Sequence, residues 1–369
     1  MKQPRIVLLA TLISASAVLG QEGVTYPRLP AQLEVRVPFQ PTAFPSQQQV
    51  HLFYELHLTN FRASPLYLSR VEVLDADSPD APPIAAFAAE QLRTMLEGIG
   101  TKASSDSQGN SEIAGGASAI VFVSIALNEG SHLPNRLLHR IVTTQSTVEG
   151  AIITTHYSVL HVLGPPLQGS NWLAHQAPSN DNHHRRGLIV LNGQPVISGR
   201  YAIDWIKVEQ GAEFSGDSAN VHSYYSYGKP ILAVADGRVV FAKDGQPDNV
   251  PGQDAFRPAL PITLETQSGN NIVLDLGDGQ FAHYNHLQPG SVRVKSGDRV
   301  RRGQVIAGVG ASGDARGPHV HFEVTTSAKP GGEGLPYVID SYHGIAGNKQ
   351  PLGLRKHELP LNDTIVAFP

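Results

Sequence analysis

Two histidines lie one residue apart in the stretch GPHVHFEV, which runs from Gly317 to Val324. Because alternate residues of a β-strand face the same side, we expect His319 and His321 to point together, away from Val320 and Phe322. Two imidazoles on one strand face can hold a metal ion, or a metal ion together with a proton-transfer group. A pair of hydrogen-bonded structural histidines at a strand end is the alternative interpretation of the same pattern.

Two further segments can contribute to such a site. Asp204 lies in Ile-Asp-Trp, and His286 lies in Tyr-Asn-His-Leu. Strict alternation puts His283 on the opposite strand face from Tyr284 and His286, and we interpret His283 as structural. The chain contains no cysteine, so any metal must be held by histidine, aspartate or glutamate.

These segments occur in a fixed order with glycine-rich turns between them, including ADGRVV and GDRVRRGQVIAGVG. Together they resemble the lysostaphin-like (LytM-type) zinc metallopeptidases, which cut peptides of the bacterial cell wall. The resemblance extends from about Gly199 to Val324, roughly a third of the chain.

The resemblance implies a role for each matching residue. Asp204 and His321 would bind Zn²⁺, His319 would help to activate the attacking water, and His286 would stabilise the transition state or act as a base. A Zn²⁺ ion with three protein ligands keeps a position open for water, lowers the pKa of that water toward about 7 and polarises the scissile carbonyl. Nearby imidazoles can then transfer protons at neutral pH.

The chain departs from the family pattern at the first metal ligand. The family has His-x-Gly-x-Asp, whereas this sequence has Arg200 and Ala202 ahead of Asp204. Arginine stays protonated and cannot ligate zinc. Either the site is incomplete or another residue supplies the third ligand. We expect Arg200 to pair with a carboxylate, of the substrate or of Asp181, or else to face solvent.

The third ligand can come from the segment ahead of Asn192-Gly193, which is a strong signal for a two-residue hairpin turn. In that register His183 lies opposite Ala202, on the same face as Asp204. A change of one residue in the loop would give this place to His184 instead. His222, in the tyrosine-rich loop GDSANVHSYYSYG, is a second candidate that we interpret as a cleft-loop residue.

The elements that must position these residues are predicted to be strands throughout. Alternating segments over 31–165 predict a β-sandwich of immunoglobulin-like type, with one helical stretch from Ala85 to Ile99. Residues 166–182, rich in Pro, Ser, Asn and Gln, predict a linker. Residues 183–345 predict a glycine-rich antiparallel β-sheet domain of the lysostaphin/LytM type, and 346–369 a C-terminal tail with one more candidate strand, Thr364 to Phe368. The predicted fold is therefore all-β.

Residues 1–20 place Lys2 and Arg5 before an apolar run, which predicts a secretory signal peptide and export to a periplasm or to the outside of the cell. We expect no membrane span elsewhere, because no other segment is long and apolar enough. A net charge of −4 with 16% charged residues argues against a nucleic-acid partner.

These patterns support two main hypotheses. The first is an exported zinc metalloendopeptidase whose substrate is a peptide, most readily one from peptidoglycan. The second is a catalytically degenerate domain of the same fold that binds cell wall or regulates a partner hydrolase. Retention of Asp204, His286, His319 and His321 favours the enzyme. The clustered site also argues against a carbohydrate-binding or adhesion protein, although the sandwich is expected to dock on a partner protein or on substrate.

Overall fold

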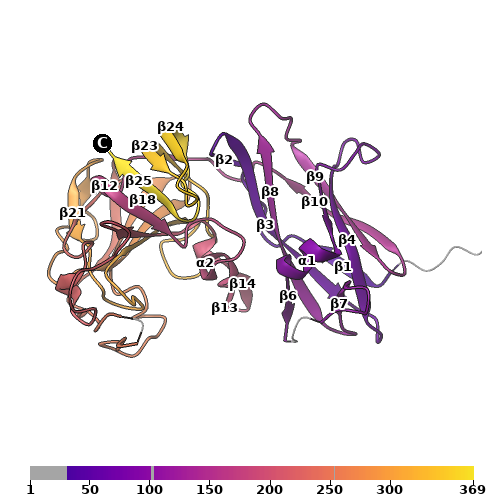
Figure 1. Ribbon diagram of the computed structural model, residues 1–369, viewed down its shortest axis with the longest axis horizontal. Helices are drawn as coiled ribbons and strands as arrows, with labels where there is room; N and C mark the ends of the chain where they lie inside the picture. Colours follow the sequence, from indigo (N-terminus) through magenta and orange to yellow (C-terminus); the bar gives the residue numbers. More distant parts are fainter. Residues whose placement is uncertain (1–30, 101–103, 253) are drawn as a thin grey trace, which may run out of the picture.

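The computed structural model describes residues 31–100, 104–252 and 254–369, so the predicted signal peptide lies outside the described residues. Strands are far more abundant than helices in these ranges and form two lobes that lie side by side (Figure 1). The all-β prediction is confirmed, with a β-sandwich at the N-terminal side and a large antiparallel sheet at the C-terminal side.

Two five-stranded antiparallel sheets pack against each other in the N-terminal lobe. Their alternating apolar residues meet in one buried cluster, in which Leu56 and Leu58 join Val71 and Val73 of the facing sheet. One sheet contains β1 (Leu33–Arg36), β2 (Phe44–Ser46), β3 (Gln49–Asn60), β6 (Leu96–Ile99) and β8 (Ser118–Asn128). The other contains β4 (Leu66–Asp75), β5 (Ala85–Ala88), β7 (Ser111–Ile113), β9 (Arg136–Thr143) and β10 (Thr147–Thr154).

The helical stretch predicted in this lobe is shorter than expected. Helix α1 covers Ala89–Met95 and buries Leu92 and Met95 in the sandwich core. The residues on either side of it extend into β5 and β6. The two ends of the segment form strands that pair with β4 and β8, so only its middle is helical.

An eleven-stranded sheet dominates the C-terminal lobe, in the order β11-β23-β25-β12-β15-β22-β19-β18-β17-β20 with β24 paired to β23. Its strand pairs are antiparallel, apart from the parallel pair β11–β23. The strands are β11 (Val162–Leu163), β12 (Gly169–His175), β15 (Ile203–Lys207), β17 (Gly237–Lys243), β18 (Asn270–Gly277), β19 (Gln280–Leu287), β20 (Arg299–Val300), β22 (Val320–Thr325), β23 (Val338–Ile345), β24 (Pro351–Glu358) and β25 (Thr364–Phe368).

Short elements surround this sheet. They are helix α2 (His183–Arg186), the 3₁₀ helices η1 (Ser198–Tyr201) and η2 (Val221–Ser223), the hairpin of β13 (Ile189–Leu191) and β14 (Gln194–Val196), and the pair of β16 (Pro230–Leu232) and β21 (Val305–Gly308). None of the helices in the described ranges has the length or apolarity that a bilayer crossing requires.

Two segments that we expected to lie outside the domains belong to this sheet. The expected linker, 166–182, contains β12, which pairs with β15 and β25. The expected tail, 346–369, contributes β24 and β25. Polar residues are frequent in 166–182, but Trp172 and Ala174 of β12 are buried in the core. The division of the chain near residue 165 stays a prediction.

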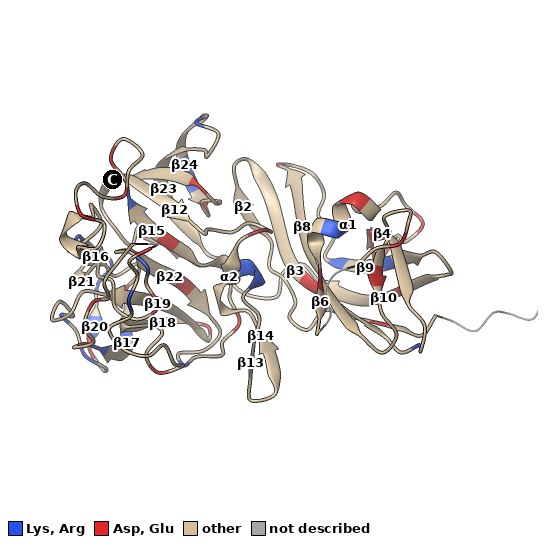
Figure 2. Ribbon diagram, turned by 60° about the horizontal axis from the view of Figure 1, so that its bottom comes forward, with Lys and Arg blue, Asp and Glu red and all other residues tan. Residues whose placement is uncertain are grey.

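The two lobes pack directly against each other. Phe44 of β2 and Phe53 of β3 belong to the same buried cluster as the C-terminal sheet. Both rings contact Tyr201 of η1, at centroid distances of 5.5 and 6.3 Å. Helix α2 lies between the lobes, beside the acidic positions of β15 and β22 that are coloured red in Figure 2.

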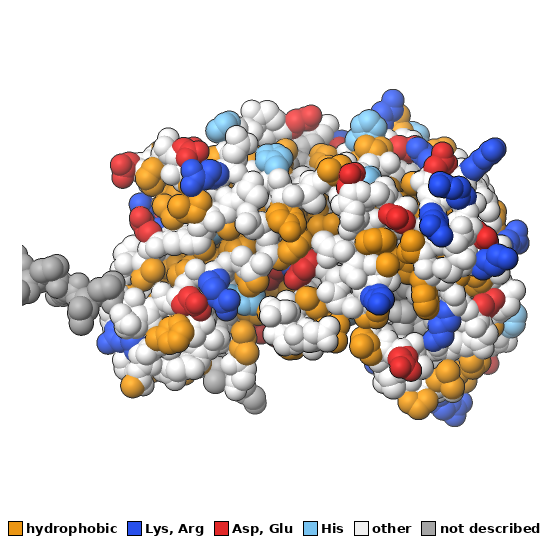
Figure 3. All heavy atoms as spheres, turned by 180° about the vertical axis from the view of Figure 1, so that it is seen from behind, with side chains coloured by type: hydrophobic (Ala, Val, Ile, Leu, Met, Phe, Trp, Pro, Cys, Tyr) orange, Lys and Arg blue, Asp and Glu red, His pale blue; other side chains and the backbone are white. Residues whose placement is uncertain are grey.

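The outer surface carries charges of both signs among apolar and neutral side chains (Figure 3). In this view from behind, Lys and Arg are more frequent over the C-terminal lobe. The small net charge of the whole chain, −4, agrees with this mixed surface.

Candidate metal centre

Asp204 and the His-x-His pair lie on neighbouring strands. Asp204 of β15 pairs directly with His321 of β22 in antiparallel register, so their side chains share one sheet face. Val320 and Phe322 are buried in the core on the other face. His319 and His321 therefore point together into the cleft, as strand alternation predicts.

His286 reaches the same face through an irregularity in β19. Its φ of 66° lies in the left-handed region that a non-glycine residue rarely adopts. The prediction that His286 shares the face of Tyr284 is wrong. Tyr284 lies in the core, whereas the left-handed backbone at His286 directs its side chain toward His319. The centroids of these two imidazoles are 4.8 Å apart. Backbone strain of this kind is typical of side chains aimed at functional sites.

The Asp204 carboxylate contacts three imidazoles. Its Oδ1 lies 2.9 Å from Nδ1 of His321 and 3.5 Å from Nε2 of His319, and its Oδ2 lies 3.4 Å from Nε2 of His184. Burial disfavours ionisation of Asp204 and is the largest single influence on it. The charges and hydrogen bonds of these histidines outweigh burial and hold the pKa of the carboxyl well below its usual value.

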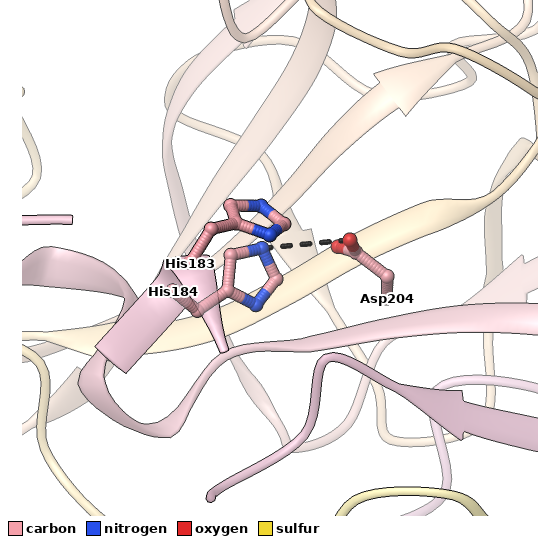
Figure 4. Close-up of side chains that lie close together, drawn as sticks. All are labelled: His183, His184 and Asp204. Atoms are coloured by element: carbon pink, nitrogen blue, oxygen red, sulfur yellow. Dashed lines mark ion pairs between the residues drawn. The ribbon is translucent and has the colours of Figure 1, made fainter. Parts of the chain in front are cut away.

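His183 and His184 lie near Asp204, but by a different route from the predicted one. The hairpin around Asn192-Gly193 forms in the expected register, with Ile189 opposite Val196. Beyond it the chain does not continue as paired strands, and both histidines stand on helix α2. Their ring nitrogens and the Asp204 carboxylate lie within 4.8 Å of one another (Figure 4).

The two histidines differ in their surroundings. His184 is buried, and its ring lies 4.7 Å from that of His321. Its Nδ1 donates to the Gln176 carbonyl at 2.9 Å, which leaves the lone pair of Nε2 directed at Asp204. His183 is exposed and stacks beside His184 at 4.3 Å. The surroundings of His184 are those of a preorganised ligand, whereas those of His183 are not.

Arg200 occupies the family's first-ligand position but is directed away from the cleft. Its guanidinium contacts Glu55 of β3 at 2.7 Å and Glu333 at 2.8 Å, and it is 3% exposed. The expectations that it pairs with Asp181 or faces solvent are wrong. Sequence alone did not indicate Glu55, which lies 145 positions away.

Hydrogen bonds fix the other imidazoles as well. Nδ1 of His286 lies 2.9 Å from the Ser312 carbonyl, and Nδ1 of His319 lies 2.8 Å from the Gly317 carbonyl. Each Nδ1 donates, so the neutral form of each ring has its lone pair on Nε2. Burial opposes protonation of His319, but its interactions with Asp204 prevail and raise its pKa. Burial, followed by the neighbouring imidazoles, lowers the pKa of His286 well below its usual value, so this histidine is neutral.

His321 has a carboxylate on each side. Its Nε2 lies 3.5 Å from Glu323, opposite the contact of Nδ1 with Asp204. Burial opposes protonation of His321, but the bonds to Asp204 and Glu323 prevail and raise its pKa to about 10. Glu323 is a site residue that sequence reasoning missed, although its position two residues after His321 puts it on the same strand face.

These side chains form the floor of a cleft with a volume of about 1120 Å³. Its walls come from loops that the glycine-rich sheet carries, including Tyr224 of the tyrosine-rich loop, Phe214 just before that loop, and Arg316. His222 does not line this cleft and packs against Tyr227, with ring centroids 4.9 Å apart. The tyrosine-rich loop therefore contributes to the cleft, but His222 does not contribute to the site.

Comparison with known proteins agrees with this geometry. Residues 220–331 match Peptidase family M23, a stretch that contains His286, His319 and His321 and begins after Asp204. The chain is 30% identical over 103 residues to the peptidoglycan DD-endopeptidase ShyB of Vibrio cholerae, covering 28% of this chain and 19% of that protein. It is 31% identical over 114 residues to the glycyl-glycine endopeptidase ALE-1 of Staphylococcus capitis, covering 31% of this chain and 26% of that protein.

The catalytic domain of lysostaphin from Staphylococcus simulans is a similar solved structure, with 22% identity, coverage of 45% of this chain and 80% of that chain, and a TM-score of 0.22. Within the C-terminal lobe, residues 220–331 match the peptidase family that the sequence motifs indicated, and the two curated relatives are endopeptidases by name. The chain spans about a fifth to a quarter of the length of the two curated relatives.

Proposed function

We propose that this protein is an exported zinc endopeptidase that hydrolyses peptide bonds in peptidoglycan. The observation that carries the proposal is the Asp204 carboxylate in contact with the imidazoles of His184, His319 and His321 at the floor of the cleft. The two curated relatives are named as endopeptidases, one of them acting on peptidoglycan. The cleft and its acid–imidazole floor support the same class of reaction here.

The donor set fits Zn²⁺. Aspartate oxygen and imidazole nitrogen are ligands that this ion prefers, and three of them leave a position open. The ion would be held by His184, Asp204 and His321. His184 would replace the histidine that the family has at the position of Arg200. The Gln176 carbonyl and Glu323 orient the two imidazoles from behind, as the outer partners of metal-bound histidines do.

The chain's own residues supply the rest of the chemistry. When bound, the ion acts as a Lewis acid that polarises a carbonyl and makes water more acidic. His319 and His286 present their Nε2 atoms beside Asp204, because each Nδ1 donates to a backbone carbonyl. His319 would take a proton from water. Neutral His286 would accept a proton at Nε2 and, once protonated, donate a hydrogen bond to the oxygen on which charge develops.

Elemental analysis of zinc in the purified protein tests the proposal. We expect about one equivalent per chain, lost in His184→Ala and in His321→Ala. His183→Ala is the matched control, because it removes the exposed neighbour on the same helix, and it should keep the metal. Loss in His183→Ala with retention in His184→Ala would overturn our choice of ligand.

Hydrolysis of defined cell-wall peptides then tests the activity. D-amino-acid cross-links and glycine bridges are the first substrates to compare, since one relative is named a DD-endopeptidase and the other a glycyl-glycine endopeptidase. Zinc-loaded protein that cuts neither class, nor any other peptide of peptidoglycan, would contradict the enzyme.

A catalytically degenerate domain that binds cell wall or regulates a hydrolase is the second candidate. Arg200 in place of the family's first histidine favours it. Wild-type protein that holds no zinc after metal-replete purification would support this alternative. The position of His184 argues the other way, because it supplies an imidazole where the motif lacks one.

A further inference from the structure

Helix α2 has four residues, two histidines followed by two arginines. A helix this short has too few hydrogen bonds to form on its own, so its place depends on tertiary contacts. The histidines point toward Asp204 (Figure 4). The arginines contact the N-terminal sandwich, which lies on the other side of α2 in Figure 2.

Arg185 is fully buried against the sandwich. Its Nη1 forms an ion pair with Glu55 of β3. Its Nη2 donates to the carbonyls of Tyr54 at 3.0 Å and Val123 at 3.3 Å. The guanidinium also lies 5.2 Å from the centroid of the Phe122 ring. These are contacts with β3 and β8 and not with the C-terminal sheet.

Neighbouring residues strengthen the same attachment. Arg186 donates to the Thr94 carbonyl at 2.7 Å, and its guanidinium lies 4.2 Å from the centroid of Phe122. Asn180 donates to the Phe122 carbonyl at 2.9 Å. The segment that contains His184 is therefore fastened to the sandwich at both ends.

Contacts on the opposite side leave little room for movement. Nδ1 of His184 is bonded to Gln176, which belongs to the same connection between β12 and α2. Helix η1 lies against α2, and a Cβ added at Gly199 would come within 3.3 Å of the His184 Cβ. A shift of α2 on the sandwich would thus move His184 relative to Asp204.

Glu55 connects these contacts. It is 3% exposed and accepts from both Arg185 and Arg200. Arg200 also pairs with Glu333 of the C-terminal lobe, so the buried carboxylate of Glu55 and the partly buried carboxylate of Glu333 balance two buried guanidinium groups across the lobes. Buried charges are tolerated only when they are paired in this way.

We propose that the sandwich takes part in building the metal centre: Glu55 is a positioning residue that holds His184 against Asp204 through Arg185. This inference rests on the proposed zinc site. It means that the C-terminal lobe needs the docked sandwich for full zinc affinity. Arg200, at the position of the family's first ligand, contacts the sandwich instead of a metal. The third ligand, His184, comes from helix α2, which Glu55 holds in place through Arg185.

Zinc affinity, measured by competition with a chromophoric chelator, tests this on the full chain. Glu55→Gln keeps the side-chain shape and removes the charge, and we expect affinity to fall about 10- to 100-fold, as when an outer partner of a metal ligand is lost. Glu72→Gln is the matched control. Glu72 is also a buried sandwich glutamate with two arginine partners, Arg70 and Arg140, but it lies in the other sheet.

The control separates positioning from general loss of stability. Equal zinc affinity in Glu55→Gln and the wild type would overturn the inference and leave the proposed function standing. Wild-type protein that binds no zinc would overturn both. Equal losses of affinity in Glu55→Gln and Glu72→Gln would also overturn the inference, because the effect would then follow stability alone.

Hydrogen exchange of the unmodified protein provides a second test that does not depend on a variant's folding. Coupling between sites is reciprocal, so zinc that binds His184 should strengthen docking of the sandwich. We expect added Zn²⁺ to slow exchange in the segments around Glu55 and Val123, with no change around Glu72. Unchanged exchange at Glu55 and Val123 in zinc-loaded protein would contradict the coupling.

Discussion

Replacing Arg200 with histidine tests whether the side chain at position 200 points into the cleft or toward the sandwich. By sequence, the substitution restores the family motif and should restore a ligand. In the structure, the Arg200 side chain extends toward β3 and ends on Glu55 and Glu333. We therefore expect Arg200→His to lose stability and to gain no metal ligand.

The magnitude follows from the contacts that would be removed. Nη2 of Arg200 lies 2.7 Å from Glu55 and 2.8 Å from Glu333, and Nη1 donates to the Gly334 carbonyl at 3.0 Å. Removing one partner of a buried ion pair costs about 3–5 kcal/mol. Glu55 keeps Arg185 as a partner, so we expect the lower end, about 3 kcal/mol.

Urea denaturation of metal-free protein measures the loss, and zinc titration in a His184→Ala background tests ligation. Arg140→His is the control, because Arg140 is 28% exposed and its loss should change stability by about 1 kcal/mol or less. Recovery of zinc binding by Arg200→His in the His184→Ala background would refute our reasoning. So would an unchanged free energy of unfolding, since the contacts of Arg200 with Glu55 and Glu333 would then contribute no stability.

Three further predictions concern other parts of the chain. His286→Ala should lower kcat about 10²- to 10⁴-fold while zinc content stays the same, as loss of an acid–base group does. Burial lowers the pKa of His139 to about 4, so the unfolded chain binds an extra proton between about pH 4 and 6.5 and stability falls as the pH falls through that range. His139→Gln should lessen this loss by about 3 kcal/mol, as shown by unfolding at several pH values. Gly310→Ala should lower both stability and zinc affinity, because the new Cβ would lie 2.4 Å from the backbone of Gln288 while Gly310 itself bonds His286 and His319.

Each of these predictions has an opposing result. Zinc loss in His286→Ala would make this residue a ligand. Parallel pH profiles for wild type and His139→Gln would show that His139 titrates normally in the folded protein, despite its bonds to Tyr54 and Ala151. A fully stable Gly310→Ala variant with normal zinc affinity would show that the strand end can shift without disturbing the site.

The sequence predicted the strand-based part of the site because short-range rules govern it. Alternation placed His319 and His321 on one face, and the turn at Asn192-Gly193 formed in the predicted register. Both features depend on backbone geometry over a few residues. The same rules failed for His286, whose left-handed backbone is stabilised by distant partners such as the Ser268 and Ser312 carbonyls.

Composition gave a wrong prediction for a polar segment that forms part of the sheet. The segment 166–182 was expected to be a linker, yet Trp172 and Ala174 are buried in β12. The same connection carries the chain into α2, which replaces the strand expected around His183 and His184. Long-range pairing with β15 and β25 decided these elements, and local propensity did not indicate it.

By itself, the sequence predicted the all-β architecture, the family resemblance, and Asp204, His286, His319 and His321 as candidate site residues. The sequence also shows that position 200 has an arginine and no imidazole. Only the tertiary structure decided that His184 faces Asp204 and that Arg200 faces Glu55. The physical reason is that buried charge must find a partner wherever the fold brings one close. The carboxylate of Glu55, 145 positions away from Arg200, does this across the boundary between the lobes.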